Sequence, residues 1–274
     1  MSEAESLKRI KVGVIGCGNM GASLVKGLVE SGFFPQNVSI FDPDTKKMNA
    51  LKKEMNIRIA KGNRPLASLV DVLILAVKPN LIDPVLEEIK TCTPATTLII
   101  SIAAGVPINR IQKFFADKPP VVRAMPNMPA TIRHGMTAYA LGSMCYPKHR
   151  KLAEKILQSL GETIEVKEKM LDLVTAVSGS GPAYFFLLTE KIIEAATHLG
   201  MKADMAKKLV YQTAIGSANL LTKSTEDPDV LIGRVASKGG TTEAALKVFA
   251  QKGFGKIVVD AVKAAETRAH ELSQ

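Results

Sequence analysis

The chain has 274 residues, of which 46% are hydrophobic and 23% charged, as expected for a globular protein with a sizeable core. Its formal net charge is +10, but the lysines are scattered, as in Lys46-Lys47 and Lys207-Lys208, which argues against a face that binds nucleic acid. No apolar run approaches the roughly 20 residues that a membrane span needs. The polar start from Met1 to Arg9 does not resemble a signal peptide, so we expect a cytoplasmic protein.

The first 130 residues alternate short apolar runs with helical periodicity. Strands are predicted over residues 10–15, 38–41, 72–77, 98–102 and 121–124, and helices over 20–31, 46–55 and 84–90. This alternation with short connections predicts a doubly wound, mostly parallel sheet.

The pattern changes near residue 170, after which we expect helices only. The short run Ile257–Val259 also suits a helix. Pro182 is expected in the first turn of a helix that Gly200 ends, and further helices are predicted over about 204–221, after Gly239-Gly240, and over about 256–271. The fold class is therefore an α/β Rossmann domain, residues 1–168, followed by an all-α domain, residues 169–274.

A glycine loop follows the first strand and opens the first helix, as in dinucleotide-binding proteins. Its first glycine allows the tight turn, the second admits the pyrophosphate, and the third lets the helix pack on the strand. The predicted cofactor residues of this loop are Gly16, Cys17, Gly18, Asn19, Met20 and, as the third glycine, Gly21. The alternative is a glycine-rich turn without a ligand.

Asp42 ends the second predicted strand, about 20 residues beyond the loop. An acid at this place accepts hydrogen bonds from the ribose hydroxyls of NAD and repels a 2′-phosphate. Alternatively, Asp42-Pro43-Asp44 is only a turn with helix-capping acids.

Five later segments are more specific than the glycine loop. They are Leu75-Ala76-Val77-Lys78-Pro79, Ser101-Ile102-Ala103-Ala104-Gly105, Val122-Arg123-Ala124-Met125-Pro126-Asn127, Val177-Ser178-Gly179-Ser180-Gly181-Pro182-Ala183-Tyr184 and Ser237-Lys238-Gly239-Gly240-Thr241-Thr242. In this order and spacing they resemble the pyrroline-5-carboxylate reductase family, from about Lys11 to about Leu272. The resemblance implies reduction of 1-pyrroline-5-carboxylate to L-proline with NADPH or NADH, the last step of proline synthesis.

The resemblance also implies roles for individual residues. The remaining cofactor contacts would be Asn63, Ala76, Val77, Lys78, Pro79, Ala103 and Ala104. The substrate contacts would be Glu168, Ser237, Gly239, Gly240, Thr241 and Thr242. The catalytic residue would be Thr242, which hydrogen-bonds the ring nitrogen, while the loop at 178–182 would open the helical domain beside the nicotinamide. Independently, residues 239–243 predict a helix start whose N–H groups can hold a carboxylate. Alternatively, Thr242 only stabilises this helix start, and Glu168 is a solvated acid.

Two departures from the family pattern matter. Lys238 stands where many relatives have proline, and we expect it to point to solvent. Asp42 stands where relatives that prefer NADPH often carry serine, which favours NADH or use of both cofactors, although Lys46 and Lys47 could reach a 2′-phosphate.

No general acid is evident. His149 and His270 are expected at the surface, His198 on a polar helix stripe, and His134 after a loop. The substrate is therefore expected to react as the iminium, with the enzyme supplying position. Cys17, Cys92 and Cys145 form no CxxC pair, so neither a metal site nor a disulfide is expected.

The resemblance implies an interlocked homodimer, which in the family often assembles into a decamer, and we expect a neighbouring subunit to complete the site. From the scattered charges and the short apolar runs, we expect no nucleic-acid or membrane partner. A rival is a hydroxyacid dehydrogenase of the 3-hydroxyisobutyrate type, in which Lys191 would be the nearest acid/base, but the 237–242 loop has no place there. A second rival, a dinucleotide-sensing regulator, would need a partner-binding segment that the sequence does not show.

Overall fold

The computed structural model describes residues 7–273, and its contacts divide them into two units. The first unit runs to Ser180 and also includes the chain from Ala265 onward, while the second is Gly181–Ala264. This division differs from the predicted boundary at 168/169. The reason is packing, because Leu171 is fully buried in the core of the first unit and the chain end returns to it.

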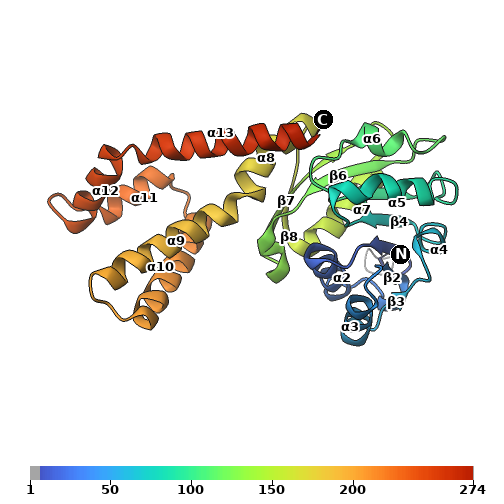
Figure 1. Cartoon of the computed structure of the whole chain (residues 1–274), viewed down its shortest axis with the longest axis horizontal. Coiled ribbons are helices and arrows are strands. Elements are labelled where there is room, and N and C mark those ends of the chain that lie inside the picture. The colour runs from blue at the N-terminus through green and yellow to red at the C-terminus, as the bar shows by residue number, and fades with distance from the viewer. Residues whose placement is uncertain (1–6, 274) are drawn as a thin grey trace. The chain divides into compact units, whose positions relative to one another are not determined.

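The first unit is built on one sheet, with strand order β3-β2-β1-β4-β5-β6-β7-β8 (Figure 1). Neighbouring strands pair in parallel except β6 and β7. The strands are β1 (Val12–Ile15), β2 (Val38–Phe41), β3 (Arg58–Ile59), β4 (Val72–Leu75), β5 (Leu98–Ser101), β6 (Val121–Met125), β7 (Gly135–Leu141) and β8 (Gly161–Glu165). The predicted doubly wound, mostly parallel sheet is confirmed.

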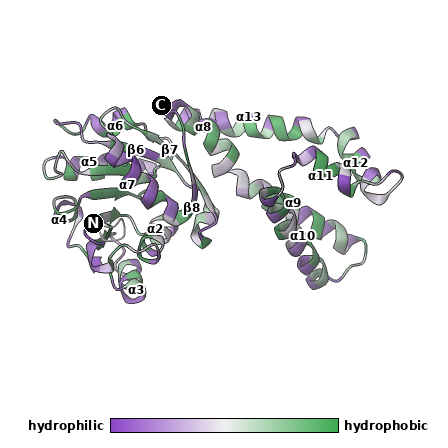
Figure 2. Ribbon diagram, turned by 180° about the vertical axis from the view of Figure 1, so that it is seen from behind, coloured by the Kyte–Doolittle hydropathy of each residue, from purple (hydrophilic) through white to green (hydrophobic). Residues whose placement is uncertain are grey.

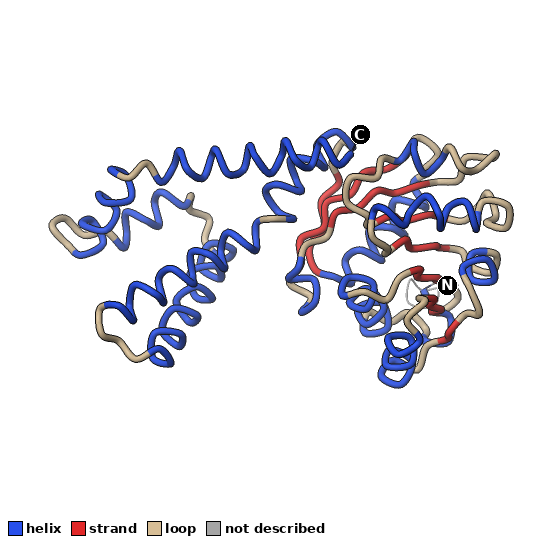
Figure 3. Tube along the Cα trace, viewed as in Figure 1, coloured by secondary structure: helices blue, strands red, loops and turns tan. Residues whose placement is uncertain are grey.

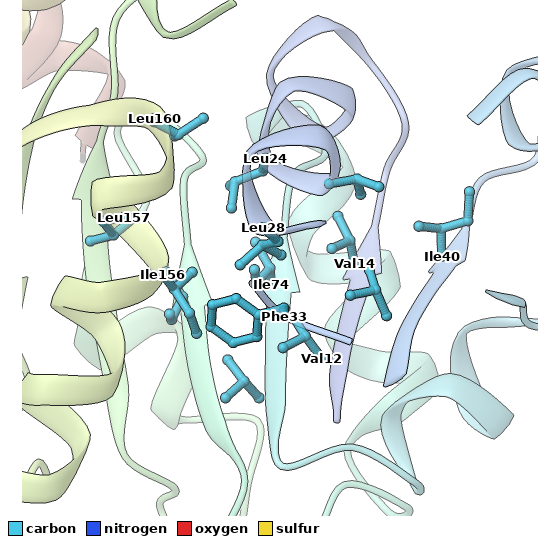
Figure 4. Packing of buried hydrophobic residues seen from close by; sticks show 14 of the residues in the cluster. Val12, Val14, Leu24, Leu28, Phe33, Ile40, Ile74, Ile156, Leu157 and Leu160 are labelled. Atoms are coloured by element: carbon cyan, nitrogen blue, oxygen red, sulfur yellow. The ribbon is translucent and has the colours of Figure 1, made fainter. Parts of the chain in front are cut away.

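Helices cover both faces of this sheet. They are α2 (Asn19–Glu30), α3 (Thr45–Met55), α4 (Asn63–Ala67), α5 (Ile82–Ile89), α6 (Ile108–Gln112), α7 (Pro147–Leu157) and α8 (Leu171–Val174). Alternate strand residues face opposite layers. Val14 and Ile74 lie with Leu28 of α2 on one face (Figure 4), whereas Leu73 lies with Leu86 of α5 on the other. Strands covered on both sides are continuously apolar, which is why their positions could be predicted.

The second unit consists of helices and connecting loops (Figure 3). The helices are α9 (Gly181–His198), α10 (Ala203–Lys223), α11 (Pro228–Val235), α12 (Thr241–Gln251) and most of α13 (Phe254–Ser273). The expected all-α region is confirmed for the described residues, and the run Ile257–Val259 is helical. α9 and α10 pack against each other.

Hydrophobic residues occur along the helices of the second unit (Figure 2), and many of their side chains are exposed. Phe185 is 72% exposed and Phe254 is 42% exposed. By length and composition, one helical segment of the described chain, Glu168–His198, could cross a membrane, although no such run was expected from the sequence. An apolar helix of this kind fits burial between copies of a chain equally well.

Candidate active site

The predicted cofactor residues of the first unit gather at one edge of the sheet. Gly16 follows β1, Asp42 follows β2 and Ala76 follows β4, and all three strands are parallel neighbours. The chain passes from β1 to β2 and β3 on one side and then crosses back to β4 on the other side of β1, so the strand order reverses here. Such a switch point is where open α/β sheets bind ligands. Ala103 lies two residues beyond β5, the next strand along this edge.

Two glycines of the glycine loop are required by close backbone contacts, and one faces open space. Gly16 has φ +101°, and a Cβ there would lie 2.5 Å from the Ala76 carbonyl oxygen. A Cβ on Gly21 would lie 2.1 Å from the Gly16 carbonyl oxygen. A Cβ on Gly18 would meet no described atom within 4 Å. The chain itself therefore requires glycine at Gly16 and Gly21. Gly18 instead leaves the room that a pyrophosphate needs.

The start of α2 suits an anion. Its N-cap, Gly18, makes no side-chain capping bond within residues 7–273, and its first turn carries no acidic residue. The first N–H groups of a helix lack intrahelical acceptors and carry partial positive charge. The residues present therefore fit the pyrophosphate of a dinucleotide.

Asp42 is held against the glycine loop by two hydrogen bonds. The Cys17 N–H donates to Asp42 Oδ2 at 2.7 Å, and the Asp44 N–H donates to Asp42 Oδ1 at 2.8 Å. Asp44 in turn caps α3 by accepting the N–H groups of Lys46 and Lys47. The turn that was weighed against the ribose contact is thus present, and it fixes the carboxylate beside the loop.

The Cys17 side chain belongs to the core rather than to the chemistry. Burial raises the pKa of its thiol to about 12, with the charge of Asp42 acting in the same direction. The thiol is therefore protonated at neutral pH and is no nucleophile. All three cysteines are free.

Asn63 begins α4, close to the end of β3. Its Nδ2 donates to Glu88 Oε2 at 2.7 Å, whereas its Oδ1 is buried without a hydrogen-bond partner among the described residues. Buried acceptors are usually satisfied. This unpaired acceptor is a second feature that fits a ligand with hydroxyl donors, such as the adenosine ribose.

The loops after β4 and β5 offer backbone rather than side-chain contacts. Ala76 and Val77 are half-buried, and Lys78 and Pro79 are exposed. Ala103 is buried, and Ala104 is half-buried. Their contact with the cofactor, which the resemblance implied, stays a prediction.

Glu168 lies in a polar network inside the first unit. Its Oε1 accepts the N–H of Ile108, the first residue of α6, at 2.7 Å and lies 3.7 Å from Nη1 of Arg123. The buried Arg123 also donates to Asp172 at 3.1 Å, and Ser273 Oγ donates to the same carboxylate at 2.8 Å. Glu168 is therefore not the fully solvated acid of the alternative interpretation, and its substrate contact stays a prediction.

The segment expected as a loop beside the nicotinamide is helical. Thr175–Gly179 forms a π-turn that links α8 to α9, with the Ser180 N–H donating to Thr175 O at 2.8 Å. Helical hydrogen bonds continue through this segment because Pro182 lies in the first turn of α9, where its missing N–H is not needed. Asn127, the last residue of the Val122–Asn127 motif, donates to the backbone and hydroxyl oxygens of Ser178.

The predicted substrate loop opens α12 in the second unit. Gly239 has φ +72°, and the Gly240 N–H donates to Ser237 O at 2.9 Å. Gly240 caps the helix without a side-chain bond in the described structure. Thr242 is half-buried, while Ser237, Lys238 and Thr241 are exposed. Exposure of Lys238 agrees with the solvent orientation that was favoured.

Glu243 partly satisfies this helix start. Its Oε2 accepts the Gly239 N–H at 2.6 Å, and Lys247 lies 3.4 Å from its Oε1. The helix start predicted over residues 239–243 thus receives one cap from its own chain, at the Gly239 N–H. The N–H groups at the beginning of α12 itself are left for another acceptor.

One histidine differs from the expectation. His149 is buried, and its Nδ1 accepts the Tyr146 N–H at 3.1 Å. Its place in the first turn of α7 was not predicted because that helix was not predicted. His134, His198 and His270 are exposed.

The fold and the glycine loop define a nicotinamide-dinucleotide-dependent oxidoreductase. Residues 168–272 match the model for pyrroline-5-carboxylate reductase dimerisation, and residues 11–105 match the model for NADP oxidoreductase, coenzyme F420-dependent. The chain is 38% identical to the pyrroline-5-carboxylate reductase of Synechocystis sp., covering 97% of this chain and 99% of the relative. It therefore belongs to the pyrroline-5-carboxylate reductase family.

Solved structures agree with this assignment. The pyrroline-5-carboxylate reductase of Coxiella burnetii superposes with a TM-score of 0.91 at 35% identity, covering 97% of this chain and 99% of that one. The pyrroline carboxylate reductase of Plasmodium falciparum, with NADP bound, gives 0.88 at 30% identity, covering 98% and 100%. The chain is thus a homo-oligomeric, NAD(P)H-dependent oxidoreductase that acts on a small molecule, and the hydroxyacid dehydrogenase rival is not favoured.

Proposed function

We propose how the residues of this chain carry out the reaction of its family, the reduction of 1-pyrroline-5-carboxylate to L-proline. The chain is a pyrroline-5-carboxylate reductase. The observation that carries the proposal is a pair of helix starts without a side-chain cap in the described structure, α2 after Gly18 and α12 after Gly240. Each can hold one anionic group: the first the pyrophosphate of the cofactor, the second the carboxylate of the substrate.

The cofactor is held by the first unit. The loop at 16–21 takes the pyrophosphate, the Asp42 carboxylate and the free Asn63 Oδ1 accept ribose hydroxyls, and residues 76–79 with 103–104 line the nicotinamide half. The fixed negative charge of Asp42 favours NADH, or the use of both cofactors, over strict use of NADPH.

The substrate is held by the 237–242 segment. The N–H groups at the start of α12 bind the carboxylate, and the Thr242 hydroxyl hydrogen-bonds the ring nitrogen. When bound, the nicotinamide supplies a hydride to the imine carbon, and the C=N electron pair passes to the ring nitrogen. Because the substrate reacts as the iminium, the nitrogen already carries its proton and no side chain has to donate one.

The rival mechanism would need an uncharged lysine as a base. A hydrogen bond from Lys191 Nζ to Glu194 at 2.7 Å raises the pKa of this lysine. A lysine with a raised pKa is charged at neutral pH and cannot accept a proton from a hydroxyl group. We therefore assign no catalytic role to Lys191.

Steady-state assays of the purified protein test the reaction. We expect turnover of 1-pyrroline-5-carboxylate with NADH or NADPH, and none when 3-hydroxyisobutyrate is offered with the oxidised cofactors. Oxidation of the hydroxyacid without imine reduction would overturn the proposal. Tight cofactor binding with neither activity would favour a regulatory protein instead.

Substitution of Thr242 tests the substrate contact. Thr242→Ala should lower kcat by about 10- to 1000-fold, the worth of one or two hydrogen bonds in the transition state. Thr242→Ser keeps the hydroxyl and should retain most of the activity. Near-normal turnover of the alanine variant at saturating imine would exclude this role for Thr242.

The assembly and location of the protein belong to the same proposal. A groove of about 610 Å³ in the second unit is lined almost wholly by apolar side chains of α9, α12 and α13, including Phe185, Leu188, Phe249 and Phe254. We propose that a second copy covers this surface in a homodimer, which assembles further into a decamer. The exposed apolar helices are then buried between copies rather than in a membrane, and the enzyme works in the cytoplasm without a nucleic-acid partner.

A further inference from the structure

One asparagine joins three elements at the carboxyl end of β6. Asn127 lies two residues beyond this strand and is half-buried. Its Nδ2 donates to the carbonyl oxygen and to Oγ of Ser178, at 3.2 and 3.3 Å. Its Oδ1 accepts the N–H of Met136 in β7 at 2.9 Å. Both ends of the amide are therefore used, one toward β7 and one toward Ser178.

The Ser178 end of this connection is the π-turn between α8 and α9. The Thr175 hydroxyl donates to Leu171 O at 2.7 Å, and the turn passes so close to β6 that a Cβ on Gly179 would lie 2.7 Å from Cε of Met125. A π-turn is rare and is frequently found at functional sites. Here Asn127 supplies bonds that hold the turn against the end of β6.

The end of β6 continues the edge that holds the cofactor. β1, β4, β5 and β6 are parallel neighbours, so the loops after them follow one another along the same edge. With the pyrophosphate at the loop after β1, the nicotinamide half extends toward β4 and β5. Ser178, held beside the end of β6, then borders the reacting end of the cofactor.

We propose that Asn127 is a positioning residue for hydride transfer. By fixing the hydroxyl and backbone of Ser178, it orders the π-turn that confines the nicotinamide ring at the end of β6. This inference rests on the proposed function. Because a misplacement of about 1 Å at the reacting atoms can lower a rate by about 100-fold, loss of this connection should act on kcat.

Two substitutions separate positioning from a purely structural role. Asn127→Asp keeps an acceptor for the Met136 N–H but loses the donor to Ser178, whereas Asn127→Ala loses both. We expect kcat to fall by about 10- to 100-fold in both variants. The dissociation constant for NADH, followed by its fluorescence, and the melting temperature of the aspartate variant should stay near those of the wild type.

Two further variants complete the test. Ser178→Ala removes one of the two acceptors of Asn127, so its kcat should fall less than that of Asn127→Ala. The double variant Asn127→Ala/Ser178→Ala should have about the same kcat as Asn127→Ala alone. Asn37→Ala is the control, because Asn37 Nδ2 makes a comparable bond to Lys8 O at 2.7 Å before β2, at the opposite edge of the sheet. It should keep the wild-type kcat.

The possible failures are distinguishable. A wild type that is active while Asn127→Asp keeps normal kcat would overturn the inference alone and leave Asn127 as a support for β7. A decrease in kcat that parallels a decrease in melting temperature in every variant would also overturn the inference. A wild type that reduces no imine would defeat the proposed function, and the inference with it.

Discussion

Asp42 carries the charge that distinguishes the two nicotinamide dinucleotides. Both carboxylate oxygens accept backbone N–H groups, so the side chain is fixed beside the glycine loop. Each oxygen still has a lone pair for a ribose hydroxyl, but the negative charge repels a 2′-phosphate. Lys47, which could offset this repulsion, lies 3.6 Å from Asp44. The positive charge of Lys47 is therefore already partly neutralised by the Asp44 carboxylate.

Asp42→Ser should change the cofactor preference. Removal of the carboxylate should raise kcat/KM with NADPH relative to NADH by about 10-fold or more, since like charges at a binding surface cost several kcal/mol and each 1.4 kcal/mol is a factor of ten. Steady-state kinetics with both cofactors measure this ratio. Asp44→Ser, in which serine can still cap α3, also releases Lys47 and should raise the same ratio by a clearly smaller factor than Asp42→Ser. An unchanged ratio in Asp42→Ser would mean that Asp42 is only a turn residue.

At the scale of single residues, the sequence predicts contacts within a motif but not those between distant segments. The glycines and Asp42 could be found because their spacing from a strand end is regular. Glu168 could not be understood in this way, since its partners, Ile108 and Arg123, are far away in the chain. Asn127 was recognisable as part of a motif, but its role depends on Ser178, which folding brings next to it.

Substitutions in the glycine loop can test folding stability and cofactor binding separately. Gly18→Ala places its Cβ in open space, so the variant should fold normally but bind NADH more weakly, by about 10-fold or more, because the methyl group occupies the path of the pyrophosphate. Gly21→Ala drives its Cβ against the Gly16 carbonyl and should lose about 1–3 kcal/mol of unfolding free energy or more. Fluorescence titration and urea unfolding measure the two effects. Wild-type NADH affinity in Gly18→Ala would contradict the proposed site.

The start of α7 depends on a neutral histidine. Burial, with a smaller contribution from Lys148, lowers the pKa of His149 below its ordinary 6.5. The stability that the neutral ring provides is complete above about pH 6.5 and is lost as the pH falls toward the folded pKa, because the unfolded chain takes up the proton first.

His149→Asn tests this dependence. Asparagine can accept the Tyr146 N–H from the same helix position but does not titrate. The unfolding free energy of the variant should therefore fall less steeply than that of the wild type between about pH 7 and pH 5, the range in which an unperturbed histidine titrates. Urea unfolding at several pH values measures the slopes. Equal slopes would show that another group controls the acid sensitivity.

At the scale of elements, burial on both faces is what made strands predictable. β4 and β5 are continuous apolar runs, whereas β8 lies at the sheet edge with exposed residues such as Glu162 and Ile164, and β3 has only two residues. These edge strands give weak patterns and were missed. β7 was missed as well, although it is largely buried inside the sheet, because Gly135 and Thr137 interrupt its apolar run. Residues 178–182 were expected as a loop because their two glycines, two serines and one proline are typical of turns. The structure instead makes them the end of the π-turn and the start of α9.

The whole molecule has an uneven distribution of apolar surface. In the first unit, side chains from both helix layers bury the sheet, while α9, α10 and α13 leave large apolar residues exposed. The family resemblance in the sequence implied a homodimer, but a single chain cannot show what covers these helices. Residues 168–272, which include these helices, match a dimerisation model, and this agrees with the proposal that a second copy covers the exposed surface.

This surface makes the oligomeric state sensitive to one charge. The wild type should sediment as a dimer or larger at micromolar concentration. Phe185→Glu should raise the dissociation constant by about 100-fold or more, because burying an unpaired charge costs about 3 kcal/mol or more. Leu69→Glu is the matched control: Leu69 is 68% exposed, close to the 72% of Phe185, but it lies in the first unit. Since an exposed leucine outside the interface contributes little to assembly, this variant should sediment as the wild type does. A wild type that stays monomeric would refute the dimer, and dissociation by both variants would mean that the apolar face of α9 is not specific to assembly.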